Sequence, residues 1–188
     1  MTRAFDPAPV DPTTTDRILD RARRAPSAGN TASVEFLVLD TAAAVEAYWD
    51  TTLTALRRDS FSWPGLLDAP TLVVPWVRPA AYVARYAESD KAHTGLGRSV
   101  DDWPVPYWFV DGGAVVIAIL LGAEAEGLGA LLFGLFGHEA AVRQRFAVPD
   151  DRRAVGAIAL GRRAPDRPSA SAARPRPPLD AVVHRGIW

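Results

Sequence analysis

At 188 residues with 48% hydrophobic side chains, the chain can bury one substantial core and suits a single domain over residues 1–188. A formal net charge of -1 offers no general attraction to nucleic acid or to an anionic membrane. The lack of cysteine excludes disulfides, thiolate catalysis and thiolate metal sites. The acidic, proline-rich start argues against a signal segment. Because the longest apolar run, 114–123, is shorter than the ~20 residues of a membrane span, we expect a soluble cytoplasmic protein.

The first part of the chain is predicted to form a helix followed by a strand. The helix carries apolar residues at helical spacing as far as Ala25, and Thr13 and Asp16 are placed as a weak capping box. It ends before Pro26, because proline disfavours helical backbone in the residue before it. The apolar run 34–39 then predicts a mostly buried strand.

The middle of the chain is predicted to hold a second helix over 45–56 and a strand over 71–74. Pro75 indicates that this strand ends early or lies at a sheet edge, because proline cannot donate to a strand ladder. A short helix is expected over 82–91, followed by an irregular stretch over 95–107.

The second half is predicted to contain a buried helix and two more strands. Asp111 is placed to cap a helix whose residues 115–121 are apolar all round, which is typical of burial in a core or in a subunit interface. Strands are expected over 130–133 and 154–160, with a helix over 138–146 between them.

Helices and strands therefore interleave irregularly, which favours an α+β fold over the regular alternation of a Rossmann fold. The segment 127–129 is no dinucleotide fingerprint, since it lies after a helix and before a strand. Residues 162–188 form an extended tail rich in arginine and proline, most of it without a burial pattern of its own.

The loop Pro26-Ser27-Ala28-Gly29-Asn30 joins the first helix to the first strand. Its residues are small and polar, and its glycine allows close approach of the backbone. Such a loop, held between two rigid elements, can present a hydroxyl and an amide to a flat ligand. The alternative is an ordinary helix-to-strand connection.

Four segments in the same order resemble the nitroreductase family of FMN-dependent oxidoreductases. They are 22–30, 111–114, 127–134, and a final strand ending at Gly161 with the tail segment 178–185. The resemblance covers nearly the whole chain. It implies a mixed sheet flanked by helices, a homodimer built around the long central helix, and C-terminal tails that each wrap across the partner.

The resemblance implies bound FMN, held by Arg3, Pro26, Ser27, Asn30, Phe133, Gly134, Leu135, Arg174 and Arg176. The loop residues match those that contact the isoalloxazine edge and ribityl chain across the dimer interface. The segment 133–135 matches main chain beside flavin N5, although a simple turn is the alternative at Gly134. Arg174 and Arg176 match phosphate-binding positions, with a solvated basic tail as the alternative.

Two departures from the family pattern stand out. Relatives mostly follow the asparagine with Gln-Pro-Trp, whereas this chain has 31–34 as Thr-Ala-Ser-Val. The family also begins with an Arg-rich segment that holds phosphate, and only Arg3 matches its end. Either the recorded start lies inside the natural protein, or the phosphate is held less strongly.

The residues themselves offer no catalytic cluster. The histidines are scattered without metal-ligand spacing, so no metal site is predicted, and no hydrolase triad is visible. Trp103, Tyr107 and Trp108 are equally compatible with an aromatic acceptor pocket and with interface packing.

A bound flavin would carry the chemistry. The resemblance therefore implies electron transfer from NAD(P)H through flavin N5 to a planar acceptor such as a nitroaromatic, a quinone or an enone. A dehydrogenase that tailors a small metabolite, a non-catalytic flavin-binding subunit and a deazaflavin electron donor remain alternatives.

Overall fold

An antiparallel sheet forms the centre of the fold in this computed structural model, which describes residues 1–188 apart from the side chain of Ala170. The strands are β1 (Glu35–Leu39), β2 (Thr71–Val77), β3 (Gly129–Phe133), β4 (Arg153–Ala154) and β5 (Ala157–Gly161). Their order is β1-β2-β5-β3, with β4 also paired to β2. The α+β class is confirmed, but every pairing of the described strands is antiparallel, so the sheet is not mixed as expected.

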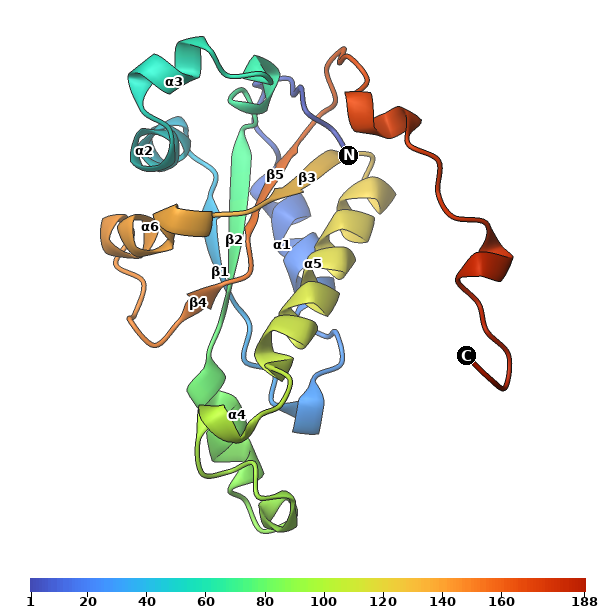
Figure 1. Cartoon of the computed structure of the whole chain (residues 1–188). Coiled ribbons are helices and arrows are strands. Elements are labelled where there is room, and N and C mark those ends of the chain that lie inside the picture. The colour runs from blue at the N-terminus through green and yellow to red at the C-terminus, as the bar shows by residue number, and fades with distance from the viewer.

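Helices cover both faces of this sheet (Figure 1). They are α1 (Pro12–Ala22), α2 (Ala42–Thr52), α3 (Ala55–Asp59), α4 (Pro79–Tyr86), α5 (Tyr107–Ala125) and α6 (Glu139–Arg145). Helices α1 and α5 pack on one face, and α2 and α6 pack on the other.

The two central strands explain why both faces are covered. Successive side chains of a strand point to opposite faces, and every residue of β2 is buried. Leu72 and Val74 join the core under α2 and α6, whereas Val73 joins the core under α1 and α5. In β5, Ala159 and Ile158 divide between the two cores in the same way.

Helix α5 is apolar on both of its sides but buried on only one. This 19-residue helix is long and apolar enough to cross a membrane, although the core helix of a soluble protein has the same properties. Val116 and Ile119 lie in the core. Val110, Ile117 and Leu121 lie on the outward side and are about half exposed or more in the single chain.

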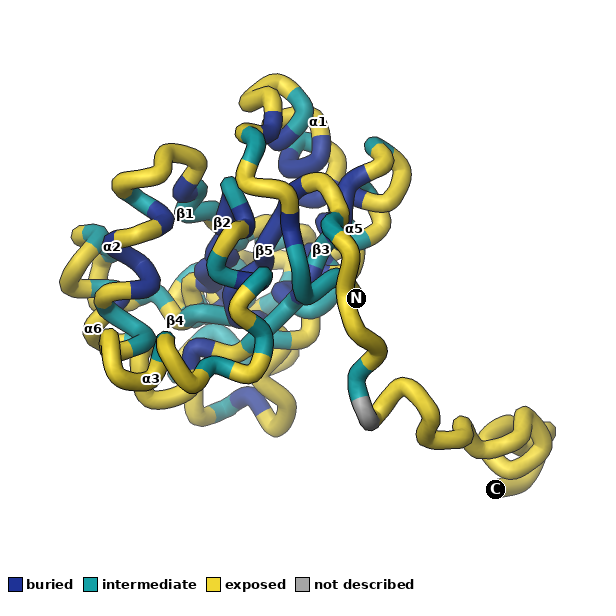
Figure 2. Tube along the Cα trace, turned by 90° about the horizontal axis from the view of Figure 1, so that it is seen from above, coloured by how far each residue is buried: buried dark blue, intermediate teal, exposed yellow. Residues whose placement is uncertain are grey.

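The C-terminal tail follows β5, contacts the body of the molecule as far as Arg167, and then leaves it. Its last eighteen residues, 171–188, are all exposed, and Figure 2 shows the tail running away from the sheet and its helices. Leu179, Ile187 and Trp188 are among its exposed apolar side chains.

Three local expectations were wrong. Helix α1 is capped by Asp11, whose carboxylate accepts the Thr13 N–H at 2.8 Å, rather than by Thr13 itself. Helix α5 begins four residues before Asp111, so Asp111 lies inside the helix and is buried. Strand β2 continues through Pro75, which sits where the partner strand changes from β5 to β4 and needs no N–H for either ladder.

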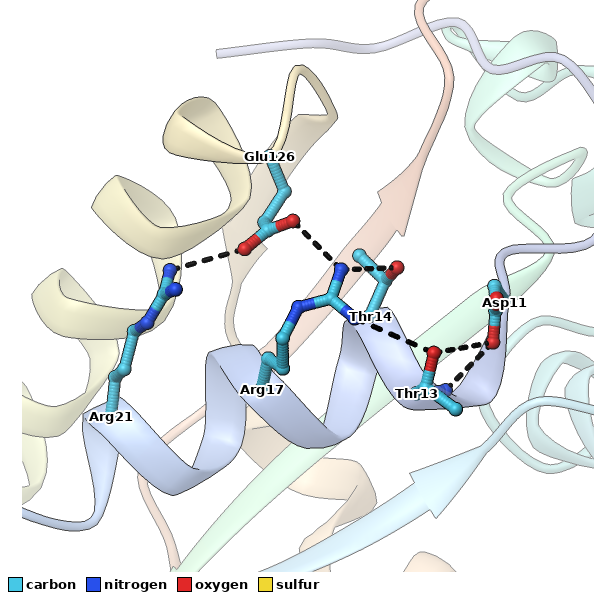
Figure 3. Close-up of polar contacts among 6 residues, drawn as sticks. All are labelled: Asp11, Thr13, Thr14, Arg17, Arg21 and Glu126. Atoms are coloured by element: carbon cyan, nitrogen blue, oxygen red, sulfur yellow. Dashed lines mark hydrogen bonds and ion pairs between the residues drawn. The ribbon is translucent and has the colours of Figure 1, made fainter.

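A polar network joins α1 to the C-terminal end of α5 (Figure 3). The Glu126 carboxylate accepts hydrogen bonds from Arg17 at 2.9 Å and from Arg21 at 3.1 Å. Arg17 also donates to Thr14 Oγ1 at 2.9 Å. The hydrogen bond from Arg17 is the main cause that lowers the pKa of Glu126.

We expect Glu126→Gln to destabilise the protein at neutral pH and to matter less in acid. Because the pKa of Glu126 is lower in the folded chain, its contribution is complete above the unfolded value of about 4.3 and is lost as the pH falls through the folded value. Urea unfolding of both proteins from pH 7 to pH 3 measures this difference. The exposed Asp16→Asn change in α1, the helix that Glu126 contacts, is the control. An equal stability difference at pH 7 and pH 3 would contradict the prediction.

Candidate functional site

The loop between α1 and β1 has an unusual backbone. Gly29, Asn30 and Ala32 have φ values of 61°, 55° and 46°, in the left-handed region that residues with a Cβ rarely adopt. The Ser27 Oγ accepts the Ala32 N–H at 2.9 Å and closes the loop from within. The loop 26–30 therefore has a specific conformation, and the left-handed residue that strains the backbone, Ala32, lies just after it.

Two charged side chains hold this loop from outside. One carboxylate oxygen of Asp111 accepts the Ala28 N–H at 2.8 Å and the Tyr82 hydroxyl at 2.7 Å. Burial, followed by the hydrogen bond to Asp111, raises the pKa of Tyr82. From α4, Arg85 donates through Nε to the Gly29 carbonyl at 2.8 Å.

Arg85 is itself fixed by acidic neighbours. Its two terminal nitrogens bind the two carboxylate oxygens of Asp90, each at 2.7 Å. This bidentate pair lowers the pKa of Asp90 to about 2. The guanidinium is therefore already oriented when it meets the Gly29 carbonyl.

An apolar cavity of about 300 Å³ opens beside the loop. It is lined by Ala28, Tyr86, Leu96, Trp103, Pro104, Val105 and Tyr107. The Trp103 ring is buried and its Nε1 donates to the Leu96 carbonyl at 3.0 Å, which fixes its orientation. Trp108 is also buried and packs behind Trp103, edge-on to it and to Tyr82.

The three expected aromatic residues therefore have different environments. Trp103 and Tyr107 line the cavity, and Tyr107 is 43% exposed. Trp108 instead belongs to the small core cluster with Val77, Tyr82 and Trp103.

At the end of β3, the side chains of Phe133 and Leu135 point into the core. The Phe133 ring stacks on Trp49 with 5.6 Å between ring centroids, and Leu135 is buried in the same core. The ring of Phe136 covers Gly134, where a Cβ atom would lie 2.7 Å from it. Because the side chains of Phe133 and Leu135 are taken up by the core, only the main chain of 133–135 is left to contact a ligand.

The expected phosphate-binding arginines are distributed over two places. Arg3 lies over one side of the Trp63 ring at 4.8 Å, with Arg167 also on that ring at 4.9 Å. Its backbone N–H donates to Asp166 at 3.1 Å. Arg174 and Arg176 are exposed on the tail, which Figure 1 shows leaving the body beside α5.

Sequence reasoning missed the residues that hold the loop. Asp111 was assigned only a capping role, and Tyr82 and Arg85 were given no role. One signal was present, because an aspartate inside an apolar helix is almost never fully buried unless it is paired. The partners of that carboxylate come from distant segments, so the sequence alone did not reveal them.

We expect Ala32→Gly to raise the free energy of unfolding by about 0.5–1 kcal/mol, because glycine removes the left-handed strain at the cost of more unfolded-state entropy. The matched control is Ala43→Gly, an exposed position inside α2, which should lose about 1 kcal/mol. Urea unfolding compares the two variants. An equal loss in both would show that Ala32 is unstrained.

Comparison with known proteins shows the family and the fold of this chain. A model of the nitroreductase family matches residues 1–162, which is most of the chain and leaves out the tail. None of the curated proteins matches the sequence.

Solved structures share the fold at low sequence identity. A nitroreductase candidate from Exiguobacterium sibiricum, solved in complex with FMN, is 19% identical with a TM-score of 0.71, over 98% of this chain and 91% of that chain. An FMN-dependent nitroreductase from Clostridium difficile is 18% identical with a TM-score of 0.67, over 100% and 94%. A candidate NADH dehydrogenase/NAD(P)H nitroreductase from Bacteroides thetaiotaomicron is 19% identical with a TM-score of 0.70, over 100% and 92%. Because the family model matches residues 1–162 and the fold is that of solved nitroreductase-like structures, the chain belongs to the nitroreductase family.

Proposed function

We propose that this protein is an FMN-dependent oxidoreductase that passes two electrons from NAD(P)H to a small planar acceptor, such as a nitroaromatic, a quinone or an enone. The observation that carries the proposal is the cavity beside Ala28. Its walls include the rings of Tyr86, Trp103 and Tyr107, and all of its lining residues are uncharged. Such a cavity suits a flat apolar ring and offers no carboxylate, imidazole or amine for proton transfer.

The chemistry must then come from a cofactor, and the residues of this chain suit a flavin. The loop offers the Ser27 hydroxyl and the exposed amide of Asn30, which are groups that bind a ribityl chain. Arg174 and Arg176 carry guanidinium groups, whose paired N–H donors match phosphate oxygens. When bound, FMN supplies two-electron redox chemistry. Two solved relatives that are described with FMN support the same cofactor.

Each part of the chain then has a defined task. The loop 26–30 orients one edge of the ring system, and the main chain at Gly134 donates a hydrogen bond where negative charge develops. Trp103 and Tyr107 exclude water from the acceptor and hold its ring by stacking. The preorganised loop needs no rearrangement to do this, because Asp111 and Arg85 already hold it.

We further propose a homodimer formed through the outward side of α5. Val110, Ile117 and Leu121 expose apolar surface along one side of this helix, and the exposed tail carries more apolar side chains that need a partner surface. A second copy would cover both. Its interface should exceed the ~2,000 Å² typical of permanent assemblies.

We expect Leu121→Arg to dissociate the dimer, because it buries a charge without a partner in an apolar interface. The matched control is Leu56→Arg, which makes the same change at an exposed leucine of α3 and should leave the dimer intact. Sedimentation at micromolar concentration distinguishes the two. A stable, folded wild-type monomer in that experiment would rule out the dimer.

We expect Arg176→Ala to weaken FMN binding by about one to two orders of magnitude, because one charge-assisted contact contributes roughly 1.5–3 kcal/mol. Riboflavin has no phosphate, so its affinity should hardly change. Arg185→Ala is the control, since it removes the same charge elsewhere on the tail. Titration of each protein with both flavins gives the result. Equal weakening of FMN and riboflavin would mean that Arg176 acts through folding of the tail.

The proposed activity is tested by the absorbance spectrum of the purified protein, followed by anaerobic mixing with NADH and with NADPH. Bound flavin that is bleached by either nucleotide supports the reductase. Bound flavin that neither nucleotide reduces favours the dehydrogenase, a deazaflavin donor or a non-catalytic subunit. Purified protein that neither contains flavin nor binds added FMN would refute the proposal.

A further inference from the structure

The buried carboxylate of Asp111 contacts the loop 26–30 from inside the fold. It is 7% exposed and lies within α5, where most neighbours along the helix are apolar. A carboxylate in such surroundings is stable only when hydrogen-bond donors face it. Its donors are the Ala28 N–H of the loop and the Tyr82 hydroxyl of α4.

The carboxylate lies between two cavities. Ala28, which it holds, lines the aromatic cavity of about 300 Å³. Asp111 itself lines a second cavity of about 140 Å³ together with Pro26 and Ser27. The hydrogen bond between Asp111 and the Ala28 N–H therefore joins a residue that lines one cavity to a residue that lines the other.

The loop needs an external hold of this kind. The left-handed conformation at Ala32 is unfavourable for a residue with a Cβ, so it persists only where neighbouring groups impose it, whereas Gly29 and Asn30 tolerate this region. Asp111 accepts from Ala28, and Arg85 donates to the carbonyl of Gly29. One negative and one positive side chain thus hold adjacent residues of the loop from two different helices.

We infer that Asp111 is a positioning residue: its buried carboxylate holds the Ala28 N–H and thereby fixes the loop 26–30 in the conformation that meets the flavin. The statement about the loop conformation stands on the contacts alone, whereas the statement about the flavin rests on the proposed function. Asp111 does not touch the reacting atoms, so its effect passes through the loop.

The test compares Asp111→Ala with Asp111→Asn. With its amide oxygen in place of the carboxylate oxygen that accepts both hydrogen bonds, asparagine can still accept the Ala28 N–H and the Tyr82 hydroxyl. Asp40→Ala, an exposed aspartate between β1 and α2, is the control. Hydrogen exchange of the Ala28 amide, resolved by NMR, reports the anchor directly, and titration with FMN reports its consequence.

We expect Asp111→Ala to speed exchange of the Ala28 amide by about 10- to 100-fold, since a hydrogen bond to a charged group is lost, and to weaken FMN binding by about tenfold. Asp111→Asn should recover most of both effects, and Asp40→Ala should match the wild type. Because the asparagine variant retains size and packing, its recovery separates positioning from a general loss of folding.

Unchanged exchange of the Ala28 amide in Asp111→Ala would overturn the inference. Faster exchange of the Ala28 amide with unchanged FMN affinity would overturn the claim that the loop held by Asp111 contacts the flavin. A wild-type protein that binds no flavin would instead refute the proposed function, and the exchange rates would still decide whether Asp111 holds the loop.

Discussion

Burial of the sheet on both faces is the constraint on which the rest of this structure depends. Every side chain of β2 is buried, and those of β5 divide between the two cores. A strand buried on both faces has no alternating polar side, so the two central strands have no free surface for chemistry. Candidate site residues are therefore confined to the ends of the sheet and to the loops around it, as the loop after α1 and the turn after β3 illustrate.

Much of this architecture was predictable because it depends on local pattern. The strands near 34–39, 71–74 and 130–133 and the long apolar helix appear where continuous apolar runs predict them. Pro75 was the exception, because a break in the neighbouring strand makes its missing N–H harmless there. Such a break belongs to the pairing of distant segments and leaves no mark in the local sequence.

The candidate site was predictable only in part for the same reason. The small residues of the loop indicated a special backbone, and the resemblance supplied roles for Ser27 and Asn30. The hold on that loop comes from residues 56 and 83 positions away in sequence, Arg85 and Asp111. A burial pattern predicts that a helix is internal, but it does not predict from which loop amide its buried carboxylate accepts a hydrogen bond.

The cluster of Arg3, Trp63 and Arg167 has a mechanical consequence for the tail. Arg167 lies on the Trp63 ring and donates to the Ser62 carbonyl at 2.7 Å, so the tail is rooted at this point. Arg174 lies seven residues beyond the root, and a chain spans at most about 3.3–3.6 Å per residue. Its guanidinium can therefore sample only a sphere of about 25 Å, extended by its own side chain. The contact of Arg167 with Trp63 therefore keeps the tail arginines at a high local concentration around any anion within that radius. A short tether raises the effective concentration of a linked binding group in the same way.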